Sequence, residues 1–391
     1  MAQNKYTEID GKPKQITGQE VYELTRQTLQ GIFELEMENS QYEAQAIWDV
    51  LIAAAVQRIT VEMACELLEK APSPNTVRTM VGEMLGDETG LSGLEKQVNK
   101  LLVARLPKGL LKRARPAAID VTEIPYHGKH DEEDDHIRRG LAKQGTTHFH
   151  SYATLYILKG NKRYTIAVTL VRQSDKMVDV IQRLIGWGQA IGLKPRRLYL
   201  DRGFDNNGVV AYLKQQPFPA IIALTIRGKQ GGTRALVQGR RSYQTTYTRA
   251  SKEYGQQTFP VAIVCKYSKG RYRRHGAFLF AYILIGHIKM HPHQIFQLYR
   301  RRFGIEASYR LMNTVRARTS STSVTLRLFY IALALLLLNL WVYVKWHFFF
   351  LPKPGPRQVL HHLFPLDRFR LWLWEVVKLR LGFSLSISLV F

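Results

Sequence analysis

The sequence predicts a mixed α/β domain preceded by a helical N-terminal region, and three observations lead to this fold class. The composition is that of a folded chain, because 391 residues with 46% hydrophobic and 22% charged residues allow two or three domains and a sizeable core. The apolar residues recur with a helical period before about residue 100. After Pro116, short apolar runs typical of strands alternate with amphipathic helices.

Residues 1–100 are predicted to form an all-α domain. From Ser40 to about Leu68 the apolar residues recur every three or four positions, and the segments 59–70 and 76–85 are further helices separated by APSPN. Ser73-Pro74-Asn75 is a typical helix start. A helix-turn-helix that binds DNA and a plain helical hairpin share this spacing, so both interpretations stay open.

The segment from residue 101 to 225 is predicted to alternate strands with helices. Three strands come first, then a helix, a strand, a helix and a strand; they cover about 117–126, 148–158, 163–171, 177–192, 196–201, 206–216 and 219–226. This order is that of a ribonuclease H-like mixed sheet with helices. Strands continue through residues 226–289, which we interpret as a β-rich insertion. A helix then opens around His293 and runs through Glu306, so that 290–350 completes the same domain.

One segment, residues 328–344, is apolar enough to be mistaken for a membrane span. Seventeen residues is the short limit for a span and Asn339 interrupts the run, so we expect a helix buried in a soluble core, under the sheet or in a dimer interface. Residues 351–391, rich in Leu, Trp and Phe, are expected to extend that packing or to form a dimer contact.

Charge is distributed unevenly along the chain. Residues 1–100 hold 9 Lys and Arg against 16 Asp and Glu, whereas residues 101–391 hold 47 against 15. A segment this basic repels itself unless it meets a polyanion, and nucleic acid is the usual one. Two cysteines exclude a disulfide framework, and the N-terminus lacks the apolar stretch of a secretory signal, so we expect a cytoplasmic, nucleoid-associated protein.

Acidic residues are rare in the basic region, so their positions are informative. Asp120 lies in the first predicted strand and Asp201 directly follows the fourth. These strands are expected to be neighbours, which would bring the two carboxylates to one sheet edge, and Glu306 lies on a late helix able to dock there. Three carboxylates in a positive environment suit a pair of Mg²⁺ ions, with Mn²⁺ as a substitute. Two such ions can cleave a phosphodiester.

The segment LYRRRFGIEASYRLMN surrounds Glu306 with phosphate-binding groups. The spacing of these residues from the glutamate predicts that all five share one helical face: Tyr299, Arg302, Glu306, Arg310 and Asn313. An ordinary ion pair between Arg302 and Glu306 is the simpler interpretation. It does not account for an aromatic ring, a second arginine and an amide on the same face, whereas contact with DNA phosphates does.

Together, DVTEIPYHGK, LDRGFD and YRRRFGIEASYR resemble the three catalytic blocks of insertion-sequence DDE transposases. More narrowly they resemble the group with the signature Tyr-x2-Arg-x3-Glu-x6-Lys, in which Asn313 replaces the lysine. The resemblance spans about Ala117 to Asn313. It implies that Asp120, Asp201 and Glu306 are metal ligands, that Tyr299 and Arg302 hold DNA, and that a β-rich insertion separates the second Asp from the Glu.

Other acids, histidines and basic residues offer alternatives. Glu123 and Asp205 lie close to the two aspartates in sequence and are rival ligands. HGKHDEEDDH lacks zinc-ligand spacing and is interpreted as a solvated loop. The predicted hairpin tip of the insertion interleaves five Lys and Arg residues with two tyrosines, and this pattern favours phosphate contact by residues that include Arg273 and Arg274.

These observations predict a DNA transposase that cuts at the ends of a mobile element and joins the 3′ ends to target DNA. The partners implied are double-stranded DNA and a second copy of the chain, since two ends must be held together. The rival interpretations are a nuclease that cuts without joining, a non-enzymatic DNA-binding protein and, from residues 328–344 alone, a membrane-associated protein.

Overall fold

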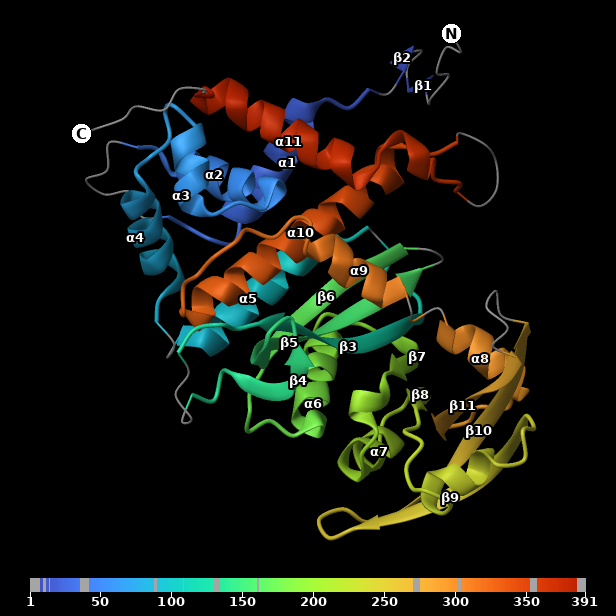
Figure 1. Cartoon of the computed structure of the whole chain (residues 1–391). Coiled ribbons are helices and arrows are strands. Elements are labelled where there is room, and N and C mark those ends of the chain that lie inside the picture. Colours follow the sequence, from blue (N-terminus) through green and yellow to red (C-terminus); the bar gives the residue numbers. More distant parts are fainter. Residues whose placement is uncertain are drawn as a thin grey trace. The chain divides into compact units, whose positions relative to one another are not determined.

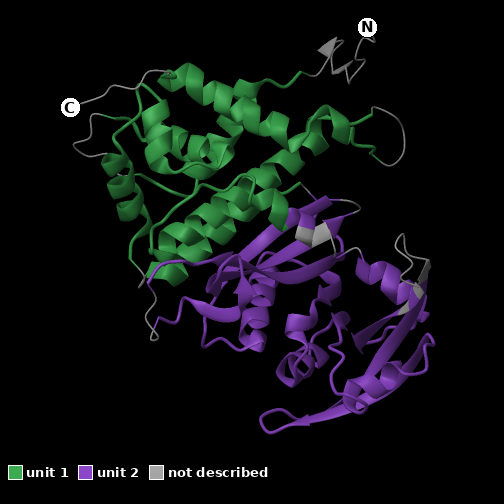
Figure 2. Cartoon of the chain, in the orientation of Figure 1, with its two compact units in different colours: residues 1–108, 309–391 green, residues 109–308 purple. Residues whose placement is uncertain are grey.

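The computed structural model of the chain forms two compact units (Figure 2). Unit 1 contains Met1–Lys108 with Tyr309–Phe391, and unit 2 contains Gly109–Ser308. The structure describes residues 8–9, 12–13, 15–35, 42–87, 90–107, 109–129, 134–159, 162–269, 275–300, 302, 304–351 and 357–384.

Unit 1 is built from helices whose starts follow ordinary capping rules. Its elements are β1 (Glu8–Ile9), β2 (Lys12–Pro13), α1 (Gly18–Gln30), α2 (Ala44–Gln57), α3 (Val61–Leu67), α4 (Pro74–Leu85), α5 (Leu91–Val103), α10 (Val324–Phe348), η5 (His361–Leu363) and α11 (Leu366–Leu381) (Figure 1). The Thr17 side chain caps α1 together with Glu20 in a capping box, and Ser73 caps α4 in front of Pro74. The two helices predicted on either side of APSPN are present as α3 and α4.

Helix α10 is the core of unit 1. It is apolar on nearly every side, and 83% of its most apolar 18-residue stretch is buried. It packs against α1, α2, α4 and α5. Asn339, the residue that interrupts the apolar run, donates a hydrogen bond from Nδ2 to the Leu102 carbonyl oxygen at 3.0 Å. By length and composition this helix is long enough to cross a membrane, and its burial is that of a core helix.

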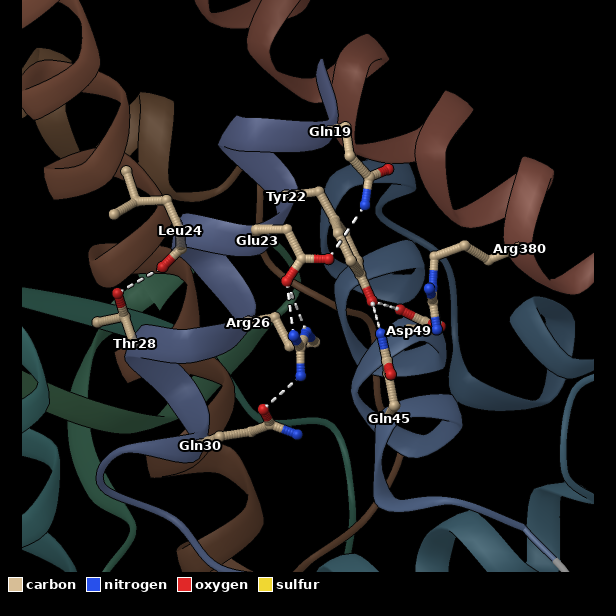
Figure 3. A network of polar contacts seen from close by, with 10 residues as sticks. All are labelled: Gln19, Tyr22, Glu23, Leu24, Arg26, Thr28, Gln30, Gln45, Asp49 and Arg380. Atoms are coloured by element: carbon tan, nitrogen blue, oxygen red, sulfur yellow. Dashed lines mark hydrogen bonds and ion pairs between the residues drawn. The ribbon is translucent and has the colours of Figure 1, made fainter. Parts of the chain in front are cut away.

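Helix α11 packs against α1 and α2. A buried polar network joins the three helices (Figure 3). Tyr22 donates to Asp49, and Arg380 donates to the same carboxylate at 3.0 Å. Burial raises the pKa of Asp49, while Tyr22 and Arg380 lower it. The arginine of α11 thus compensates a charge buried in α2.

The domain boundaries predicted from the sequence are wrong in one respect. Residues 1–100 do not stand apart, and the segment after residue 309 belongs with them rather than with the strand-rich domain. The reason is hydrophobic burial: α10 carries apolar side chains all round, and they pack against the N-terminal helices.

Unit 2 is a mixed α/β unit around a nine-stranded sheet (Figure 1). Its elements are β3 (Arg115–Pro125), β4 (Arg138–Lys143), β5 (Thr146–Lys159), β6 (Lys162–Val171), α6 (Met177–Ala190), β7 (Pro195–Leu200), η2 (Arg202–Phe204), α7 (Asn207–Lys214), β8 (Ala220–Ala223), η3 (Gly232–Val237), β9 (Tyr243–Ser251), β10 (Gly255–Lys269), β11 (His275–Ile285) and α8 (Pro292–Arg300). The predicted order of three strands, helix, strand, helix and strand is confirmed. Strand β4 was not predicted, because RRGLAK lacks an apolar alternation.

Strand order brings the first and fourth predicted strands together. The sheet runs β4-β5-β3-β7-β8-β11-β10-β9, with β6 paired to β5. The pairs β3–β7 and β7–β8 are parallel, and the others are antiparallel. Strands β9, β10 and β11 of the predicted insertion extend this sheet through the β11–β8 pair. Within the described residues they are therefore part of one sheet and not a separate body.

Candidate active site

Asp120 and Asp201 come together at one edge of the sheet. In the parallel β3–β7 pair, Ile119 lies opposite Leu200, and each aspartate is the next residue along its own strand. Asp120 is 6% exposed and Asp201 is half-buried. The Asp201 carboxylate also accepts a hydrogen bond from the Gly203 backbone N–H at 3.0 Å, which holds it at the start of η2. The convergence expected from the sequence is present.

Arg302 supplies the positive charge between these carboxylates. Its Nη1 lies 3.2 Å from Asp120 Oδ2, and the residue is 7% exposed. Burial raises the pKa of Asp201, and the charge of Arg302 opposes that rise. For Arg302 itself burial lowers the pKa, but Tyr299 and both aspartates outweigh it and the net shift is upward. The guanidinium therefore stays charged and neutralises the carboxylate pair.

Tyr299 fastens α8 to the same edge. Its hydroxyl donates to the carbonyl oxygen of Leu200 at 2.9 Å, directly before Asp201, and its ring packs against Tyr282 and Tyr199. The residue is 2% exposed, and burial raises its pKa to about 12. The DNA contact implied by the family resemblance stays a prediction, and the hydrogen bond that the structure shows is a structural one. It positions the end of β7.

The single helix predicted from His293 through Glu306 is interrupted. Helix α8 ends at Arg300 and α9 (Gly304–Met312) begins four residues later, with Arg302 outside both. Glycine is a weak helix former, and Gly304 stands at the start of α9. The break lets Arg302 reach Asp120. The predicted common face of Tyr299, Arg302 and Glu306 is therefore wrong, because these residues are not on one helix.

The remaining residues of the predicted face lie on α9 or directly after it. Glu306 lies in α9, but its side chain is outside the described part of the structure, so its approach to the aspartates stays a prediction. Arg310 is exposed, and Asn313 follows the end of α9 with its Oδ1 buried and lacking a hydrogen-bond partner. Both belong to unit 1. Arg273 and Arg274 lie outside the described residues.

Asp205 has a structural role that its sequence position did not reveal. Its carboxylate accepts from the Thr225 backbone N–H at 2.7 Å and from Arg249 Nη1 at 2.5 Å, and the residue is 5% exposed. Arg249 comes from β9, so this pair ties the loop after Asp201 to the end of β8 and to the distal strands. Both carboxylate oxygens of Asp205 therefore take part in structural contacts.

Glu123 is an unsuitable ligand for this site. It stands three positions after Asp120 on β3, and side chains alternate between faces of a strand. The two carboxylates therefore project to opposite sides of the sheet. The Glu123 carboxylate lies close to Gly140 of β4, on the far side of β5 from β3.

The histidine- and acid-rich tract does not form a metal centre in its described part. His136 Nδ1 pairs with Asp134 at 3.3 Å, and Asp135 accepts from the backbone N–H and the hydroxyl of Ser174 at 2.8 and 2.7 Å. Among the side chains that the structure describes, no three His, Cys, Asp or Glu residues gather as a metal site. Glu306 is not among those side chains, so this leaves the predicted triad untested.

Comparison with known proteins identifies the family of the chain. Residues 112–342 match the family described as "Transposase DDE domain". Among solved structures, the chain is similar to the piggyBac transposase in a cryo-EM synaptic complex with hairpin DNA. Sequence identity is 10% over 99% of this chain and 77% of that chain, and the TM-score of 0.50 indicates a related fold.

No curated protein matches the sequence. The family match nevertheless covers more than half of the chain and includes Asp120, Asp201 and Glu306. The chain therefore belongs to the DDE-domain transposases, and it is a DNA transposase.

Proposed function

We propose that this transposase cuts DNA at the ends of a mobile element and joins the 3′ ends to target DNA, with Asp120, Asp201 and Glu306 holding two Mg²⁺ ions. The observation that carries the proposal is the placement of Asp120 and Asp201 at equivalent positions of neighbouring parallel strands. The strand and helix order, with β3, β7 and β8 parallel, supports a ribonuclease H-like catalytic fold.

The residues present suit hard divalent cations. Carboxylate oxygens are the ligands that Mg²⁺ and Mn²⁺ prefer. In the structure, the negative charge of the Asp120 and Asp201 carboxylates is balanced by Arg302. Bound divalent ions would supply Lewis acidity toward the scissile phosphodiester and its attacking oxygen. Arg302 would orient Asp120 and balance its charge, while Tyr299 would keep the end of β7, and with it Asp201, in register.

DNA is the partner that the charge of the chain supports. Unit 2 holds 34 Lys and Arg against 13 Asp and Glu, whereas unit 1 holds 22 against 18. We further propose that α4 of unit 1 takes part in choosing the DNA sequence, that two copies of the chain hold the two ends, and that the protein resides in the cytoplasm on the nucleoid. If the protein resides on the nucleoid and not in the membrane, high salt should release it from washed cell membranes.

The test is cleavage and joining by purified protein on a plasmid that carries the DNA flanking its own gene. Asp120→Asn, Asp201→Asn and Glu306→Gln should each abolish Mg²⁺-dependent cleavage and leave DNA binding in gel shifts largely intact. Glu123→Gln is the matched control and should cleave normally. Near-normal cleavage by any of the three variants would remove that residue from the ligand set. Cleavage without joined products would instead identify a nuclease, and binding without either reaction a non-enzymatic DNA-binding protein.

A further inference from the structure

We infer that the loop between β8 and β9, residues 225–242, is a binding surface for the DNA phosphate backbone beside the carboxylate edge. This basic loop carries five basic residues and no acidic residue: Arg227, Lys229, Arg234, Arg240 and Arg241. The inference rests on the proposed function, because it assigns the loop to the same DNA that the carboxylates would cut.

The sheet topology places the start of the basic loop at the edge that holds Asp201. Strand β8 runs parallel to β7 with Ile222 opposite Leu200, so both strands end at the same edge. The loop begins two residues after the end of β8, and its first residue, Thr225, donates its backbone N–H to Asp205 at 2.7 Å. Asp205 is only four residues beyond Asp201. DNA held by the loop would therefore lie next to the carboxylates.

The basic loop is folded rather than extended into solvent. The buried Thr233 hydroxyl accepts from the Arg227 backbone N–H at 2.7 Å and donates to the Thr225 carbonyl oxygen at 2.8 Å. Arg234 Nε donates to the Gly228 carbonyl oxygen at 2.7 Å, and the Tyr243 hydroxyl donates to Leu236 at 2.6 Å. These bonds fold the loop backbone into a compact surface loop.

Gly228 is required by the shape of this loop. Its φ is +93°, and a Cβ there would stand 2.5 Å from the Gly231 carbonyl oxygen. Any other residue would be strained at that φ and would collide with the backbone. The turn therefore brings the first and second halves of the loop close together, which concentrates its positive charges on one small surface.

The charges of the basic loop are not compensated within the described part of the chain. Arg227, Lys229, Arg240 and Arg241 are exposed, and no acidic side chain described in the structure contacts them. Between Asn206 and Ile305 the sequence has a single acid, Glu253, and it pairs with Lys176. A solvated surface loop normally mixes both signs of charge. A compact, acid-free loop fits a polyanion.

The experiment compares two pairs of substitutions that remove the same charges from opposite ends of the sheet. Arg227→Gln/Lys229→Gln alters the basic loop. Lys194→Gln/Arg196→Gln alters exposed residues at the start of β7, the end away from Asp201. Binding to a fluorescent duplex of random sequence is measured against salt concentration in EDTA. The slope of log affinity against log salt should fall by about 2 for the loop variant, since each phosphate contact contributes roughly 0.9, and should stay unchanged for the control.

Further arms separate this inference from the proposed function. Because the assay contains EDTA, it does not depend on the metal ligands. Arg240→Gln/Arg241→Gln should repeat the loss, and Thr233→Val, which keeps every charge but removes the internal hydrogen bonds, should weaken binding less than either pair.

Equal slopes for the loop and control pairs would overturn the inference. Wild-type protein that binds with the expected slope but never cleaves in Mg²⁺ would overturn the proposed function and leave the loop assignment standing. A duplex that carries the element end, compared with the random one, shows whether the loop meets end DNA or target DNA.

Discussion

Asp205 and Arg249 form a largely buried ion pair next to the site, so their loss should affect folding before it affects chemistry. The Asp205 side chain is 1% exposed and that of Arg249 20%. Breaking a buried pair leaves an uncompensated charge and costs about 3 kcal/mol. Asp205→Ala should therefore lower the urea midpoint strongly. Asp367→Ala, at a side chain 87% exposed, is the control and should change it little. Equal stability of the two variants would show that Asp205 is dispensable to the fold.

Arg302 should affect stability in a pH-dependent way. Burial raises the pKa of Asp201 above its ordinary value, so ionised Asp201 disfavours folding, and this cost appears as pH rises through the raised pKa. Arg302 counteracts the shift, and Arg302→Ala should raise the pKa of Asp201 further. The stability deficit of Arg302→Ala relative to wild type should therefore grow between about pH 4 and about pH 7, the range above the ordinary aspartate pKa. Arg302→Lys, which keeps the charge, should show a smaller deficit. A deficit that shrinks with rising pH would contradict this role.

At the scale of elements, local patterns predicted the type of most helices and strands but not their long-range partners. The alternation in β3, β5 and β6 and the apolar run of β7 were sufficient to predict the neighbouring aspartates. The break between α8 and α9 was not predicted, although Gly304 lies at it, and the sequence could not show that Arg302 at this break contacts Asp120, a residue far away in sequence. For the same reason the sequence could not show that Asp205 pairs with Arg249.

Helix α10 provides a test of element packing. Leu335 is completely buried, and removal of its side chain should cost about 2–5 kcal/mol through lost burial and a cavity. The matched control is Leu379→Ala on α11, at a leucine 85% exposed, which should stay within about 0.5 kcal/mol of wild type. In hydrogen exchange, Leu335→Ala should reduce protection in α1, α2, α4 and α5 and spare β3, β5 and β7. Loss of protection centred on the sheet would mean that α10 supports unit 2 instead.

At the scale of the whole molecule, the chain returns to its first unit after completing the second. Residues 1–108 lack α10 and α11, which bury their apolar faces, and Arg380 on α11 compensates the buried Asp49. A fragment of residues 1–108 should therefore unfold without cooperativity. Fusion of that fragment to residues 309–391 should restore a cooperative thermal transition, measured by circular dichroism. Cooperative unfolding of residues 1–108 alone would show that the C-terminal helices are not needed.

The division into units also relocates the affinity for DNA. The sequence contrast between residues 1–100 and 101–391 places the positive charge broadly in the later part of the chain, but the structure concentrates it further. Unit 2 has a net charge of +21 and unit 1 only +4.

Because unit 2 is one continuous segment, residues 109–308 can be produced alone, with folding checked by circular dichroism. This fragment should bind random-sequence DNA with a steep salt dependence close to that of the full chain, since counterion release follows the number of phosphates contacted. The fused unit 1 should bind weakly, and any preference it shows should be for particular sequences through α4. Strong, salt-sensitive binding by unit 1, or none by residues 109–308, would place the phosphate contacts on the helical unit and leave the positive charge of the sheet without a DNA partner.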